Sequence, residues 1–259
     1  MLDSRVSHRH SPTAPQQDRR GEQRRPLLEH ARVRLCLGVL LTVAAGWLDA
    51  VGYLRLQEFY LSFMTGNSIK LGVAAAAGNW LPAAAGALVV ALFLLGALTG
   101  TLLAEMPGAW SLPATLALAA GLLGTALGLS LAGWGPFHAL VPVVLAMGVQ
   151  NVALPPLGGV RLGATFITGT LVSVGQEMGR ALLGKPGRRA WGRHALVWAG
   201  LVAGATAGAA WTERASLDAL LPPAALVAIL AAACTVAVAI ERRRRRLPFA
   251  AREAVGDAT

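Results

Sequence analysis

The feature that most constrains this chain is a series of long apolar runs separated by short polar segments. Each run is close to the ~20 residues that an α-helix needs to cross a lipid bilayer. Strands of a membrane barrel would be about ten residues long and would alternate in polarity. The runs therefore predict an all-α polytopic membrane protein, a helical bundle with six strong transmembrane helices. They occupy residues 35–54, 81–103, 112–132, 137–157, 195–211 and 220–240.

The charged residues are few and unevenly placed. They make up only 14% of the chain, against about 25% in soluble domains. The net charge of +10 comes mainly from arginines in residues 1–34, in the loop 184–194 and in the run from Arg242 to Arg246. Basic residues that flank membrane helices mark the cytoplasmic side, so both termini are predicted to be cytoplasmic. This placement explains the charge without a nucleic-acid partner, and the last run is expected to contact anionic lipid headgroups.

The chain divides into one membrane domain and two tails. Residues 1–34 are polar and rich in Arg, Pro and Gln, which predicts a disordered tail. Residues 35–240 form the predicted transmembrane domain, and residues 241–259 form a second basic tail. Cys36 and Cys234 lie in apolar runs and lack the spacing of a metal or redox site. The sequence carries none of the common hydrolase, metalloprotease or nucleotide-binding motifs, so we expect no enzymatic activity and no cofactor. Composition leaves the oligomeric state open.

Two weaker segments, residues 59–77 and 164–183, are apolar but carry related polar motifs. The first segment holds Phe-Met-Thr-Gly-Asn at residues 63–67, and the second holds Phe-Ile-Thr-Gly-Thr at residues 166–170. Glycine and polar residues that interrupt corresponding membrane segments are typical of broken helices that form binding sites. The two motifs therefore indicate where a functional site is expected.

These motifs are part of an internal repeat with three anchors in the same order. The first anchor is Gly-x-x-Asp at Gly46, matched by Gly-x-x-Asn at Gly148. The second is the pair of Phe-x-Thr-Gly motifs. The third is Gly-x-x-x-Gly followed by a glutamate, which begins at Gly96 and again at Gly204. Because the anchors recur at a nearly constant offset, we predict two repeats, about 35–134 and 137–240.

The relation between the repeats depends on the two weaker segments. If both cross the bilayer, each half has four crossings and the halves are parallel. If both are re-entrant, each half has three crossings and the halves are inverted. The arrangements differ in the side on which the loop 106–110 lies, outside in the first and inside in the second. The tight connections and the length of each segment, about one bilayer, favour the crossing arrangement.

The most specific motifs resemble a known family. Gly-Trp-Leu-Asp-Ala at residues 46–50, Phe-Met-Thr-Gly-Asn at 63–67 and Gly-Val-Gln-Asn at 148–151 are similar to hallmarks of the YoaK-like family. This is a bacterial group of multi-pass membrane proteins with a domain-of-unknown-function label, and the likeness covers roughly residues 35–240. The resemblance implies an integral protein of the bacterial inner membrane. It implies no activity, substrate or catalytic residue.

Asp49 lies inside the first apolar run, where an ionisable residue is costly and is a functional candidate by default. It is either a carboxylate that couples to protons or cations, or a structural partner, for instance of Lys70. Lys70 itself either attracts an anionic group or extends to the interface. Gln150 and Asn151 either line the same cavity or tie helices together.

The first polar motif predicts a helix start. Thr65, Gly66 and Asn67 are expected to cap a half-helix that begins near Ser68, and its free N–H groups would attract an anion. The alternative is a polar kink bonded to the second motif. The candidate substrate or ion-coupling residues are therefore Asp49, Thr65, Gly66, Asn67, Lys70, Gln150, Asn151, Thr168, Gly169 and Thr170.

Glu177 and Arg180 are three residues apart and share one helix face, as an ordinary ion pair or a cytoplasmic gate. Two functions fit the whole pattern. The first is a secondary transporter or exporter of a small solute with a polar site at the repeat interface. The second is a non-transporting scaffold or sensor, in which the polar motifs serve helix packing.

Overall fold

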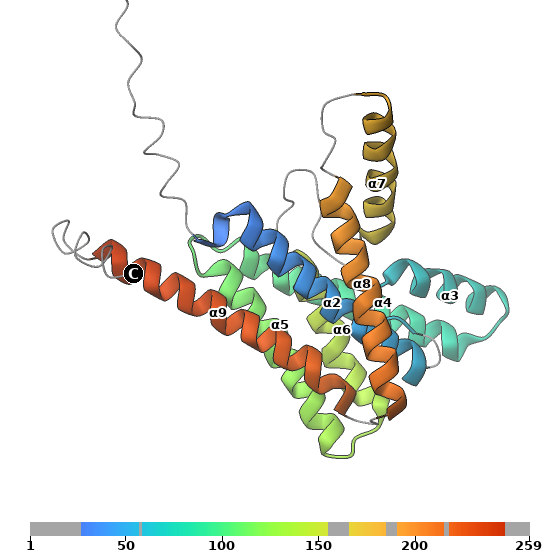
Figure 1. The fold of residues 1–259 in the computed structure, drawn as a ribbon. Coiled ribbons are helices and arrows are strands. Elements are labelled where there is room, and N and C mark those ends of the chain that lie inside the picture. The colour runs from blue at the N-terminus through green and yellow to red at the C-terminus, as the bar shows by residue number, and fades with distance from the viewer. Residues whose placement is uncertain (1–26, 57–58, 155–165, 185–190, 215–217, 247–259) are drawn as a thin grey trace, which may run out of the picture.

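The computed structural model describes residues 27–56, 59–154, 166–184, 191–214 and 218–246 (Figure 1). Every regular element in these ranges is a helix and none is a strand, which confirms the predicted all-α class. The elements are η2 (Leu27–Glu29), α2 (Ala31–Arg55), α3 (Met64–Ala76), α4 (Trp80–Ala104), α5 (Ser111–Leu131), α6 (Pro136–Val152), α7 (Ile167–Leu182), α8 (Trp191–Arg214), η4 (Asp218–Leu220) and α9 (Leu221–Arg246).

Five of these helices, α2, α4, α5, α8 and α9, are long and apolar enough to cross a membrane. The sixth predicted span corresponds to α6, which has 17 residues and is also apolar, so the count of six remains a prediction. The disordered tails were predicted for residues 1–34 and 241–259. Most of both tails lies outside the described residues, while α2 already begins at Ala31 and α9 continues through the arginine run.

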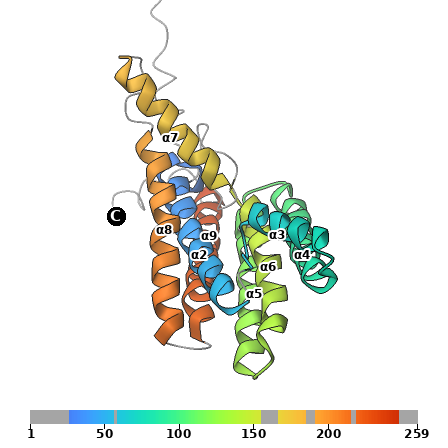
Figure 2. The same cartoon turned by 90° about the vertical axis from the view of Figure 1, so that its right-hand side faces the viewer.

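The helices pack in two groups that meet along α5 and α9 (Figure 2). In one group α2 packs closely on α8, and in the other α4 packs closely on α6. Glycines permit both approaches, because a Cβ atom on Gly204 would overlap the backbone carbonyl of Val43 and one on Gly96 would overlap that of Leu145. Small residues at such crossings are typical of helix packing in membranes. The core between the groups is apolar and includes Leu116.

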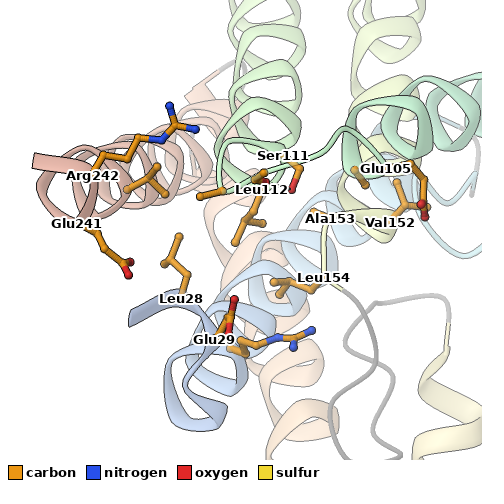
Figure 3. Close-up of a pocket in the computed structure, with 15 residues that line it drawn as sticks. Leu28, Glu29, Glu105, Ser111, Leu112, Val152, Ala153, Leu154, Glu241 and Arg242 are labelled. Atoms are coloured by element: carbon orange, nitrogen blue, oxygen red, sulfur yellow. Dashed lines mark hydrogen bonds between the residues drawn. The ribbon is translucent and has the colours of Figure 1, made fainter. Parts of the chain in front are cut away.

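The helix directions follow from which termini meet. The start of α2, the end of α4, the start of α5 and the end of α9 surround one cavity of about 720 Å³, lined by Glu29, Glu105, Ser111 and Arg242 among others (Figure 3). We call this side the Arg242 end. At the opposite side Arg55 donates a hydrogen bond of 3.0 Å to the carbonyl oxygen of Thr212, which joins the last turns of α2 and α8. We call that side the Arg55 end.

These directions show that neither weaker segment carries the chain across the bundle. Since α2 ends and α4 begins at the Arg55 end, residues 56–79 leave and return on the same side. Since α6 ends beside the cavity and α8 runs parallel to α2, the connection that contains α7 likewise starts and finishes at the Arg242 end. The loop 106–110 also lies there, because Arg242 Cζ is 5.3 Å from the centre of the Trp110 ring.

The crossing arrangement favoured by the sequence is therefore wrong, because each weaker segment starts and finishes on one side of the bundle, as the re-entrant alternative expects. The physical reason lies in the helix lengths. With a rise of 1.5 Å per residue, the 13 residues of α3 extend about 20 Å, short of the ~30 Å hydrocarbon core. Leu61 and Ser62 bond to Asp49 of α2 instead of extending α3 toward its N-terminus. Segment length alone did not reveal this return.

Candidate functional site

The Asp49 carboxylate holds the segment that returns from the end of α2. Its Oδ1 accepts hydrogen bonds from the backbone N–H groups of Leu61 at 2.7 Å and Ser62 at 2.6 Å. Its Oδ2 accepts a third bond, 2.7 Å long, from the hydroxyl of Ser62. Leu61 and Ser62 are almost fully buried, so these bonds satisfy groups that water does not reach. The carboxylate therefore has a structural partner, and it is the returning chain.

Asn67 holds the same segment from the other side. Its side-chain amide donates to the carbonyl oxygen of Tyr60 at 2.7 Å and accepts from the N–H of Tyr60 at 3.0 Å. The side chain is completely buried. The oxygen and the nitrogen of the amide thus both bond to the backbone of Tyr60. Asn67 fixes where α3 begins.

The expected half-helix exists, but its start differs from the prediction. Helix α3 begins at Met64, with Phe63 at the N-cap and no side-chain cap bond. The chain is already helical there, and the Met64 N–H bonds to the carbonyl oxygen of Ser62 at 3.2 Å. The prediction that Thr65 and its neighbours cap a helix near Ser68 is therefore wrong, because these residues form the first turn of α3. The second motif behaves alike, since α7 begins at Ile167.

We expect Asn67→Leu to lower the free energy of unfolding by about 2 kcal/mol, because the N–H and the carbonyl oxygen of Tyr60 lose their bonds to this buried amide. Thr65→Ala is the matched control from the same motif, and its exposed side chain predicts a change within about 0.5 kcal/mol. Thermal and denaturant unfolding in detergent measure both. Equal stability of Asn67→Leu and the parent protein would contradict this role for Asn67.

The returning segment also forms one wall of a cavity of about 660 Å³. Residues of α2, of the returning segment, of the start of α7 and of α8 surround it. We call this cavity the Asp49 pocket, and its lining residues are Gly46, Asp49, Ala50, Tyr53, Leu54, Tyr60, Phe63, Ile167, Thr168, Leu201, Ala205, Thr206 and Ala209. Of the candidate residues predicted from sequence, Asp49 and Thr168 meet here.

The other candidates lie elsewhere. Gln150 is buried and its Nε2 donates to the carbonyl oxygen of Leu41 at 2.8 Å, which ties α6 to α2. The Nδ2 of Asn151 donates to the carbonyl oxygen of Met147 on its own helix. Thr170 is buried, and its hydroxyl donates to the carbonyl oxygen of Phe166. Thr65 and Gly169 are exposed. Gly66 lies against the rings of Tyr60 and Phe63. Of the two roles predicted for Gln150, the structure shows the one in which it ties two helices together.

An aromatic cluster completes the pocket, and the sequence reasoning missed it. The Tyr60 ring centre lies 5.5 Å from that of Tyr53 and 5.4 Å from that of Phe63, the second pair edge to face. The Nζ of Lys70 lies 5.9 Å from the ring centre of Tyr53 and 5.7 Å from that of Phe59. Among the described residues, the contacts of the Asp49 carboxylate come from the returning backbone and Ser62 instead of Lys70. A single signal was available, the four aromatic residues within residues 53–63.

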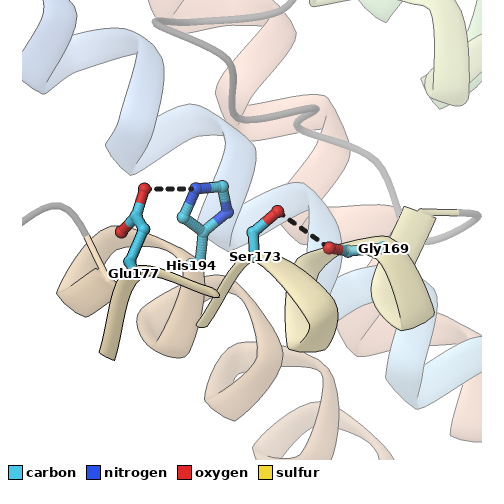
Figure 4. A network of polar contacts seen from close by, with 4 residues as sticks. All are labelled: Gly169, Ser173, Glu177 and His194. Atoms are coloured by element: carbon cyan, nitrogen blue, oxygen red, sulfur yellow. Dashed lines mark hydrogen bonds and ion pairs between the residues drawn. The ribbon is translucent and has the colours of Figure 1, made fainter. Parts of the chain in front are cut away.

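The second predicted polar pair is also rearranged. Glu177 Oε1 lies 3.6 Å from the Nε2 of His194, so the pair joins α7 to α8 (Figure 4). Both side chains are largely buried, and Ser173 beside them bonds back to Gly169. Arg180 is exposed. Within the described ranges, Glu177 thus pairs with the adjacent helix and not with Arg180, so its contact docks α7 at the Arg242 end.

Comparisons with known proteins place the chain among membrane proteins. A family model described as a protein of unknown function, DUF1275, matches residues 37–233. The chain is 30% identical over 214 residues to the UPF0700 transmembrane protein RA0705 of Rhizobium meliloti (strain 1021), covering 82% of this chain and 92% of that protein. It is 31% identical over 180 residues to the UPF0700 transmembrane protein YoaK of Bacillus subtilis (strain 168), covering 64% and 77%. No solved structure matches significantly.

Proposed function

The chain belongs to the DUF1275 family, as its motifs predicted, and it is an integral membrane protein. We propose that it is a secondary transporter or exporter of a small solute. The observation that carries the proposal is the Asp49 pocket. It places an intramembrane carboxylate in a cavity formed by residues from both halves of the chain. Ionisable residues at such positions mark solute or ion pathways in many transporters.

The packing supports two inverted repeats around this pocket. Gly204 packs on Val43, and Gly96 packs on Leu145. The anchors of the predicted repeat relate these contacts, since Gly96 corresponds to Gly204 and the offset between Gly46 and Gly148 relates Val43 to Leu145. Corresponding helices run in opposite directions, because α2 starts and α6 ends at the Arg242 end. Inverted repeats with short helices that begin at the site are typical of secondary transporters.

The positive charges support a cytoplasmic Arg242 end. Arg34 at the start of α2, Arg193 at the start of α8 and the arginines from Arg242 at the end of α9 all lie on this side. By the positive-inside rule, this supports cytoplasmic termini, which is consistent with the proposed location in the bacterial inner membrane. The arginines at the end of α9 are also positioned to bind anionic lipid headgroups.

One observation favours the second function, a scaffold or sensor. Asp49 and Asn67 bond to the protein's own returning segment, so both have a structural task without any solute. In that case the Asp49 pocket is filled by lipid or by a partner helix, and no solute stabilises the protein. The two functions therefore differ in a measurable way.

Thermal unfolding of the purified protein against a broad panel of metabolites and ions tests the transporter proposal. A ligand at 100 times its dissociation constant adds about 2.7 kcal/mol to the stability of the folded state, which such a screen detects. Ala209→Phe places a ring inside the pocket and should abolish the shift. Ala117→Phe, on an exposed position of α5, is the matched control and should retain it.

Solute uptake into proteoliposomes then distinguishes transport from binding. The proposal predicts saturable uptake that Ala209→Phe eliminates and Ala117→Phe preserves. A panel in which no solute shifts unfolding, together with an absence of uptake, would overturn the transporter proposal in favour of the scaffold or sensor.

A further inference from the structure

We propose that the Asp49 pocket binds a small lipophilic cation, an organic ammonium or phosphonium group that carries an apolar body. This inference rests on the proposed function and names the chemical class of its solute. It follows from three properties of the pocket, which are its charge, its aromatic wall and its apolar remainder.

The pocket is lined by one acidic side chain and by no basic one. The three groups that donate to the Asp49 carboxylate are two backbone N–H groups and one hydroxyl, all of them neutral. They replace the water that a carboxylate loses in a membrane, but they bring no positive charge. Among the residues that line the pocket, Asp49 is the one acidic side chain and no lysine or arginine occurs. A bound cation supplies the compensation that buried charges require.

The aromatic wall suits a cation. Tyr53, Tyr60 and Phe63 all line the pocket and lie close together. The faces of aromatic rings attract cations within about 6 Å, and the attraction strengthens when water is excluded. The protein itself provides an example, because the ammonium group of Lys70 lies 5.9 Å from the centre of the Tyr53 ring.

The remaining wall is mostly apolar, and Thr168 and Thr206 are its hydroxyl-bearing residues. Gly46, Ala50, Ala205 and Ala209 line the pocket where α2 and α8 pack together, and Leu201 adds further apolar surface. A volume of about 660 Å³ falls within the range of pockets that hold drug-sized ligands. A strongly hydrated ion would leave this surface unused, whereas a cation with an apolar body would bury it.

Substitution of Lys70 is predicted to strengthen cation binding instead of weakening it. Its ammonium group shares the Tyr53 ring with the pocket and repels a second cation. Lys70→Met removes that charge and keeps a long side chain. We expect it to tighten binding of a cation at least about threefold, since like charges at close range disfavour each other.

Two ions of nearly the same shape and opposite charge test the class directly. Tetraphenylphosphonium is the cationic probe and tetraphenylborate is the anionic one. Binding of each to the detergent-solubilised protein is measured by titration, with Ala209→Phe in the same micelles as the blank for partitioning. We expect saturable binding of the phosphonium at least about tenfold tighter than that of the borate, equivalent to 1.4 kcal/mol.

Variants then assign the preference to the pocket. Asp49→Asn keeps the size and most hydrogen bonds of the side chain and should remove the preference for the cation. Tyr53→Leu should weaken phosphonium binding about tenfold, whereas Phe137→Leu, an exposed ring on α6 outside the pocket, should not change it.

The outcomes separate this inference from the proposed function. Equal or tighter binding of the borate, blocked by Ala209→Phe, would overturn the cationic class while leaving a solute pocket intact. Phosphonium binding that persists in Ala209→Phe is partitioning into the micelle and would overturn the inference. The proposed function itself fails only if the solute panel and uptake assays described above are also negative.

Discussion

Gly204→Ala is expected to lower the free energy of unfolding by about 3 kcal/mol, although alanine normally stabilises a helix relative to glycine by up to ~1 kcal/mol. The reversal has a direct cause. The added Cβ atom would overlap the backbone carbonyl of Val43, so α2 and α8 must separate along their whole contact. A backbone cannot turn aside as a flexible side chain can. Denaturant unfolding in detergent and the yield of monodisperse protein measure the effect.

Two further variants make this prediction specific. Gly96→Ala should be equally damaging, because its Cβ atom would overlap the carbonyl of Leu145 in the contact of α4 with α6. Gly124→Ala on α5 is the matched control, since a Cβ atom there has no neighbour within 4 Å, and its stability should be unchanged or slightly raised. If all three variants unfold alike, close backbone approach does not hold the two helix pairs together.

The helices and their glycine motifs could be identified from the sequence because the signals are local. A run of about 20 apolar residues has few alternatives to a membrane helix, and α2, α4, α5, α8 and α9 fulfil that expectation. The Gly-x-x-x-Gly motifs that begin at Gly96 and Gly204 are equally local, and the sequence shows them as anchors of the predicted repeat. The residues that these glycines contact on the neighbouring helices, however, could not be predicted from a single sequence.

The returning segment could not be predicted because its cause is tertiary. Thr65 and Asn67 have the composition of a helix cap, and that local preference was overridden. Asn67 binds the backbone of Tyr60, and the chain between them reaches helical geometry at Met64. Likewise Glu177 had a suitable partner three residues away, but its carboxylate contacts His194 on the next helix. In each case a contact across space replaced the contact along the chain.

Asp49 is predicted to act both through its hydrogen bonds to the returning segment and through its charge. Two substitutions separate these roles. Asp49→Ala removes the acceptor for three donors in a buried segment, each of which costs about 1–3 kcal/mol when unsatisfied. We expect this variant to lose about 3 kcal/mol or more of its free energy of unfolding. Asp49→Asn retains an oxygen for the two N–H groups, and its amide can donate to the Ser62 hydroxyl, so it should lose less than about 1.5 kcal/mol.

The comparison of the two variants decides what the carboxylate is for. If Asp49 serves only to hold the returning segment, asparagine replaces it with little consequence, and solute-dependent stabilisation is the same as in the parent protein. If its charge also serves a bound solute or a coupled ion, Asp49→Asn folds normally but loses that response. Unfolding measured with and without the best solute of the panel distinguishes these results. Severe unfolding of Asp49→Asn itself would show that the charge, and not only the hydrogen bonds, holds α3 in place.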